Sequence, residues 1–164
     1  MHVPGWALLA SFWLHMLATV LWLGGLAIFS LIILPSVRQT LKAGDFRGWF
    51  AVMNRRLDSI GWFSVGLLTF TGLVQMDANP NYLGLFDISN QWGQAICLKH
   101  IAFGGMIGVS AYITWGVSPA LARATLIKQG VAERRHEVHL QRLTAVNLIL
   151  GVAVLVFTAL ARIQ

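Results

Sequence analysis

The sequence predicts an all-α integral membrane protein, a four-helix bundle made of two tandem helical hairpins with both termini outside. Three observations support this fold class. The 164 residues are 57% hydrophobic and only 11% charged, whereas soluble domains carry about 25% charged residues. Four long runs of sequence lack charged side chains, and the basic residues concentrate in two of the connections between these runs. The composition excludes a soluble enzyme, a secreted disulfide scaffold and a disordered linker.

The four apolar runs are each long enough to cross a bilayer as a helix, which takes about 20 residues. Pro35 and Pro119 are expected to end the first and third helices, because proline interrupts helical hydrogen bonding. The first run lacks a basic leading region and is longer than the apolar core of a signal peptide, so it is expected to be a permanent span. We assign residues 1–164 to a single transmembrane domain with helices at about 7–34, 59–77, 93–117 and 143–161.

The distribution of basic residues predicts the orientation of the chain in the membrane. Ten of the twelve lysines and arginines lie between spans one and two or between spans three and four, whereas the connection 78–92 has none. The positive-inside rule places both basic connections in the cytoplasm and both termini outside. The net charge of +6 is therefore explained by topology and by contact with anionic lipid, and nucleic acid is not an expected partner.

The two predicted hairpins resemble each other in sequence. In each, a histidine is followed by a proline 19 or 20 residues later and by an arginine 23 residues later. This pattern is typical of a parallel repeat around an axis along the membrane normal. The alternative is that two unrelated spans end in proline and arginine. The matching residues are His15, Pro35 and Arg38 in the first copy, and His100, Pro119 and Arg123 in the second.

Two histidines lie inside predicted spans, where ionisable groups are costly and often functional. His15 and His100 are each expected about 10–12 Å below the outer surface, on helices one and three. Two imidazoles at equal depth suit one haem b with bis-His ligation. Other metals, or hydrogen bonds between helices without any metal, remain alternatives. Asn147 and Gln75 are likewise expected to form hydrogen bonds between helices.

The residues around these histidines are compatible with a haem site. Lys99, near the outer surface, could face the haem propionates, and Trp22 would form an aromatic wall. On the third span, small residues at helical spacing would leave room for a macrocycle. This predicted stripe consists of Cys97, His100, Gly104 and Gly108.

Copper is the alternative metal. Cys97 and His100 are three residues apart and share a helix face, and thiolate and thioether ligands select Cu(I). Met16, Met76 and Met106 lie in the membrane zone, although methionine in an apolar helix is usually packing material.

The expected role is that of a redox or accessory subunit more than of a stand-alone enzyme, because few side chains could serve in catalysis. One haem near the outer face could exchange electrons with a quinol or a periplasmic carrier, but it could not carry electrons across the membrane alone. Other membrane subunits of a redox complex, or further copies of the chain, are the expected protein partners.

The first span resembles that of the CopD-like (copper resistance protein D) family. The shared pattern is a histidine, then W-x-G-G-L, then an apolar run ending in L-P, and the segment WGQAICLKHIAF is similar to a second family pattern. The resemblance implies a four-helix module in the bacterial inner membrane, with periplasmic termini and a link to copper import. His100 beside Lys99 departs from the copper pattern and favours haem. The matching residues are His15, Trp22, Gly24, Gly25, Leu26, Leu34 and Pro35, with Trp92, Gly93 and Lys99 in the second segment.

The chain is also similar, more weakly, to HemJ-type protoporphyrinogen oxidases, which resemble it in size and are thought to carry haem b. The matching residues are His15, Trp22, Gly25, Leu34 and Pro35. The L-P-R sequence of that family is absent, because this chain has Ser36 after Pro35.

Overall fold

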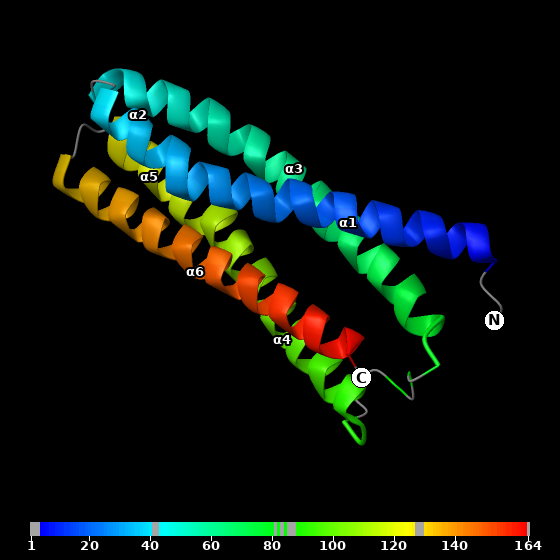
Figure 1. Cartoon of the computed structure of the whole chain (residues 1–164). Helices are drawn as coiled ribbons and strands as arrows, with labels where there is room; N and C mark the ends of the chain where they lie inside the picture. Colours follow the sequence, from blue (N-terminus) through cyan, green and yellow to red (C-terminus); the bar gives the residue numbers. More distant parts are fainter. Residues whose placement is uncertain are drawn as a thin grey trace.

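A computed structural model describes residues 4–40, 43–80, 82, 84, 88–126 and 130–163, and this part of the chain contains helices and no strand. Figure 1 shows the helices, which run side by side along one common direction. Their bounds are α1 (Gly5–Ile28), a π-helical turn η1 (Phe29–Ile33), α2 (Leu34–Thr40), α3 (Ala43–Asp77), α4 (Gln91–Tyr112), a second π-helical turn η2 (Ile113–Val117), α5 (Ser118–Leu126) and α6 (Gly130–Arg162).

Four helical segments are long and apolar enough to cross a membrane, as predicted: Gly5–Val37, Val52–Asp77, Gln91–Ala124 and Arg134–Arg162. Large apolar side chains such as Trp13, Phe63 and Ile149 are exposed on their outer faces. Helices α3 and α6 extend well beyond the predicted spans into the basic connections. Charged residues are compatible with a helix once it leaves the hydrocarbon, so a charged residue does not mark the end of a helix.

The two prolines do not end the first and third spans, contrary to the prediction. Helix continues through Pro35 into α2 and through Pro119 into α5. A proline removes one i→i−4 hydrogen bond, and its ring crowds the carbonyl of residue i−4. In both spans a π-helical turn immediately precedes the proline: η1 ends at Ile33 and η2 ends at Val117. A π turn inserts an extra residue into the helix, so the wider turn accommodates the proline where a break was expected.

Helix α3 packs along α1, and α6 packs along α4, while α1 also contacts α6. In Figure 1 the two termini and the α3–α4 connection lie toward one end of the molecule, and the α2–α3 and α5–α6 connections lie at the other. Two apolar clusters join these helices. One is centred on Ala18, Trp22, Leu68 and Met106, and the other on Phe29, Ile113, Val117, Leu121 and Leu140. The side of the bilayer that each end faces stays a prediction.

Labelling of single cysteines tests the predicted orientation. In a Cys97→Ser background, Gln91→Cys and Arg135→Cys place thiols at exposed positions at opposite ends of the molecule. We expect a membrane-impermeant maleimide to label Gln91→Cys in intact cells and Arg135→Cys only after permeabilisation. The Cys97→Ser parent measures background labelling, and the reverse pattern would invert the topology.

Gly151 allows close packing among α6, α1 and α4. A Cβ atom there would overlap the Leu23 side chain and would lie 3.3 Å from the Met106 Cε atom. We expect Gly151→Leu to lower the free energy of unfolding by about 1–3 kcal/mol, the usual cost of overpacking a core. Thermal unfolding in detergent measures this loss. Gly66→Leu is the matched control, because a Cβ at Gly66 meets nothing within 4 Å; an equal loss in both variants would contradict the packing described.

Candidate functional site

His15 on α1 contacts α3, and its hydrogen bond determines which ring nitrogen is free. The His15 Nδ1 atom lies 2.7 Å from Thr71 Oγ1, and the Thr71 hydroxyl donates its only proton to the Leu67 carbonyl oxygen at 2.6 Å. Thr71 Oγ1 must therefore accept from His15, so the proton of the neutral imidazole is on Nδ1. The lone pair of His15 Nε2 is then available, which is the state in which histidine binds a metal.

The surroundings of His15 hold its ring in place. Gly72 brings the α3 backbone against the imidazole, because a Cβ at this position would lie 3.6 Å from His15 Cε1. Ser11 Oγ donates to the Thr71 carbonyl oxygen at 3.1 Å, and Gln75 Nε2 donates to the Ser11 carbonyl oxygen at 3.2 Å. The predicted interhelical hydrogen bond of Gln75 is thereby confirmed. This network fixes α1 against α3 at the level of His15.

His100 has a different environment. Its Nδ1 atom lies 2.7 Å from the carbonyl oxygen of Ile96, on the same helix, and its side chain is exposed. A carbonyl oxygen can only accept, so the proton of the neutral imidazole is again on Nδ1 and Nε2 is unbound. The structure thus gives the two histidines the same tautomer but different partners, α3 for His15 and the α4 backbone for His100.

The predicted small-residue stripe on α4 faces outward. Gly104 and Gly108 are exposed like His100, and Cys97 is half-buried with a free thiol. The buried face of α4 is instead formed by Trp92, Ala95, Ala102 and Met106. The physical reason is the choice of partner: α4 packs mainly on α6 and not on α1. The shelf expected beside His100 for a macrocycle is therefore not enclosed within this chain.

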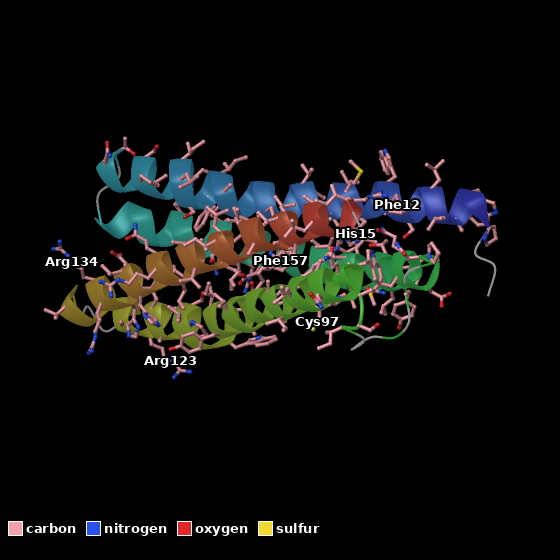
Figure 2. The ribbon with its side chains drawn as sticks, turned by 60° about the horizontal axis from the view of Figure 1, so that its bottom comes forward. Phe12, His15, Cys97, Arg123, Arg134 and Phe157 are labelled. Atoms are coloured by element: carbon pink, nitrogen blue, oxygen red, sulfur yellow. The ribbon has the colours of Figure 1, made fainter. Side chains whose placement is uncertain are left out.

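Lys99 and Trp22, both expected beside the haem, lie in different parts of the structure. Lys99 is half-buried on α4, and its ammonium lies near enough to interact electrostatically with His15. Trp22 belongs to the core: its ring packs edge-on against Phe103 with centroids 5.8 Å apart, and Gly61 lies beneath its indole nitrogen. Figure 2 shows His15 and Cys97 in the half of the molecule away from Arg123 and Arg134.

A second cluster of polar side chains, which was not predicted from the sequence, lies farther along the helices from His15 and is centred on Asp58 and Asn147. The Asp58 carboxylate on α3 accepts from Asn54 Nδ2 and from Thr114 Oγ1, each at 3.2 Å. Asn147 on α6 donates to Ser110 Oγ at 2.8 Å, which confirms its expected interhelical hydrogen bond. Asp58 was not predicted because the expected second span began at residue 59, so this carboxylate was assigned to the basic connection. Its position directly before that span is the signal that could have identified it.

The donor atoms available for a metal are limited in the described part of the chain. No group of three or more His, Cys, Asp or Glu side chains there is arranged to hold a metal ion. His15 fits copper as one ligand, because imidazole nitrogen binds this metal. The described His, Cys, Asp and Glu side chains therefore do not form a complete site for a permanently bound metal ion.

Comparison with protein families gives a match to Copper resistance protein D over residues 51–161. The chain belongs to the CopD family. The matched region contains α4, α5 and most of α3 and α6. It includes Thr71, Lys99 and His100 but excludes α1 with His15. The resemblance to CopD predicted from the sequence is confirmed, whereas the similarity to HemJ is not shown. No curated protein and no solved structure matches the chain significantly.

Replacing Thr71 tests the tautomer of His15. We expect Thr71→Val to remove the acceptor for Nδ1–H, to shift His15 toward the Nε2–H tautomer, and to destabilise the protein by about 1 kcal/mol. Nitrogen-15 NMR of histidine-labelled protein in micelles distinguishes the tautomers.

Thr71→Ser is the control, because it keeps the hydroxyl and should keep the Nδ1–H form. His100 serves as an internal reference, since its bond to the Ile96 carbonyl oxygen is untouched. An unchanged His15 signal in Thr71→Val would contradict the role given to Thr71.

Proposed function

We propose that this CopD-family membrane protein handles copper and that His15 Nε2 is a ligand for the copper ion. The observation that carries the proposal is the hydrogen bond from His15 Nδ1 to a threonine hydroxyl whose own proton is already donated. This arrangement leaves a neutral imidazole with one free nitrogen in a membrane-spanning helix. Family membership over residues 51–161 supports copper as the metal.

Transient binding, with copper as cargo, fits these residues better than a resident centre does. Transport requires that an ion bind strongly enough to enter a site and weakly enough to leave it. A single preset imidazole is compatible with that requirement, and the soft side chains Cys97 on α4 and Met76 on α3 are candidates for further ligands. Predicted topology puts this end of the molecule on the periplasmic side, so copper would be met from outside.

Support for haem b is weaker than the sequence suggested. A bis-His haem needs both imidazoles on opposite faces of one macrocycle, whereas His15 is held against α3 and His100 is exposed on α4. The name of the matching family, copper resistance protein D, supports a role in copper handling more than one in electron transfer. Haem b binding, with electron exchange to a quinol or a periplasmic carrier, is therefore the alternative function. The metal analysis described next distinguishes it from copper handling.

Metal analysis of the purified protein tests the proposal. We expect Cu(I) to bind, His15→Ala to abolish most of this binding, and Thr71→Val to weaken it by about tenfold, the usual cost of losing the partner that orients a ligating histidine. Competition with a Cu(I) chelator measures the affinity.

His136→Ala is the matched control and should leave copper affinity unchanged. This half-buried histidine lies on α6 two residues after Arg134, which Figure 2 shows far from His15. His100→Ala shows whether the second membrane histidine contributes. Protein isolated with iron and without copper, with Soret and α bands in its reduced spectrum, would replace copper handling by haem binding.

A further inference from the structure

A cavity of about 80 Å³ lies between the helices, at the level of the two π-helical turns. Phe29 of η1 and Ile113 and Thr114 of η2 contribute to its wall, together with residues of α1, α3, α4 and α6. Its polar lining consists of Asn54, Asp58, Trp62, Ser110, Thr114, Thr144, Asn147 and the indole of Trp22.

The Asp58 carboxylate brings a negative charge to this cavity. Both of its hydrogen-bond donors, Asn54 and Thr114, are uncharged. The described residues that line the cavity include no lysine, arginine or histidine. A carboxylate inside a membrane-spanning segment is costly unless its charge is balanced. The cavity therefore favours a positively charged ligand.

Asn147 provides an independent indication of a ligand. Its side chain is only 1% exposed, and its Nδ2 group donates to Ser110 Oγ. The Asn147 Oδ1 atom is buried and has no hydrogen-bond partner among the residues that the structure describes. A buried acceptor without a partner costs about 1–3 kcal/mol. Because Asn147 lines the same cavity as Asp58, a cation or its bound water there would satisfy this oxygen.

We propose that this cavity binds one small, hard monovalent cation of the Na⁺ type together with bound water. Carboxylate, amide and hydroxyl oxygens are ligands for hard cations. Among the described residues, the lining contains no sulfur or imidazole that would select copper. A single carboxylate balances a single positive charge, whereas a divalent ion would leave one charge uncompensated. The cavity is large enough for an ion and a few waters, since one water needs about 10–15 Å³ of space open to its centre.

The cation would link side chains from three parts of the helical structure. Asp58 belongs to α3, Thr114 follows α4, and Asn147 belongs to α6. The core cluster around Trp22 and Met106 lies between this cavity and His15. The cavity is thus a second ion site, separate from the proposed copper ligand, and it does not depend on the copper proposal.

Sodium-dependent thermal stability tests the proposal in the purified full chain. A ligand that binds the folded state alone raises its stability with concentration. We expect the unfolding temperature to rise saturably when NaCl replaces choline chloride at constant ionic strength and pH, and ²²Na⁺ to bind at one site per chain. KCl and CaCl₂ arms measure selectivity for size and charge.

Asp58→Asn should abolish both responses, and Asn147→Leu should weaken Na⁺ binding while retaining the carboxylate. Asp77→Asn is the matched control, because this aspartate is exposed at the end of α3 and should leave the sodium response intact. If Asp58→Asn does not fold, ²²Na⁺ binding to the wild type and to Asn147→Leu decides. A wild-type protein that responds to pH but not to Na⁺, or a sodium response that persists in Asp58→Asn, would overturn the proposal.

Discussion

The hydrocarbon core of a bilayer offers no hydrogen-bond partner, and this constraint determines where each polar side chain of the protein lies. Most hydroxyls inside the spans satisfy it within their own helix. Thr19, Thr69 and Thr158 each donate to the carbonyl oxygen four residues earlier. Other polar contacts cross between helices, among them His15 to Thr71, Asp58 to Thr114, and Asn147 to Ser110. These crossings fix the register of α1 on α3, and of α3 and α6 on α4.

The same constraint explains why the prolines do not break their spans. A helix end inside hydrocarbon would expose unsatisfied carbonyls and N–H groups. A π-helical turn keeps the backbone nearly continuous, and in both odd-numbered spans it ends two residues before the proline. The two spans thus share a π-helical turn as well as the predicted spacing of histidine, proline and arginine, although the repeat itself stays a prediction. Both wide turns contribute to the wall of the Asp58 cavity.

The fold was predictable to the extent that it depends on composition. Apolar runs longer than the bilayer is thick predicted four spanning helices, and these are present. The faces of those helices were not predictable, because each is apolar nearly all round and carries no amphipathic pattern. Periodicity therefore placed His100, Gly104 and Gly108 on one stripe but could not say that the stripe faces outward. That information resides in the packing of Ala95, Ala102 and Met106 against neighbouring helices.

The candidate sites show the same division between composition and packing. His15 was identified because an imidazole in an apolar run is rare, but its tautomer depends on Thr71, which is 56 residues away in sequence. Asp58 was missed because charge was used to mark the edge of the second span. A rule that ends a span at its first charge removes a functional carboxylate whenever that carboxylate lies one turn inside the membrane.

The interior contains two polar regions, one around His15 and Thr71 and the other around the Asp58 cavity, and an apolar layer separates them. Along α3, Thr71 and Asp58 are about 20 Å apart at 1.5 Å per residue. Ala18, Trp22, Leu68 and Met106 fill the space between them, and Ala18 and Met106 are each only 1% exposed. An ion held at His15 cannot reach the Asp58 cavity through this layer unless side chains or helices move. A Cβ atom at Gly61 would lie 3.6 Å from the Trp22 indole nitrogen, so α1 and α3 approach each other closely within this layer. Trp22 belongs to α1 and Leu68 to α3, so opening this layer would change the packing of α1 on α3, the same interface that the hydrogen bond between His15 and Thr71 holds together.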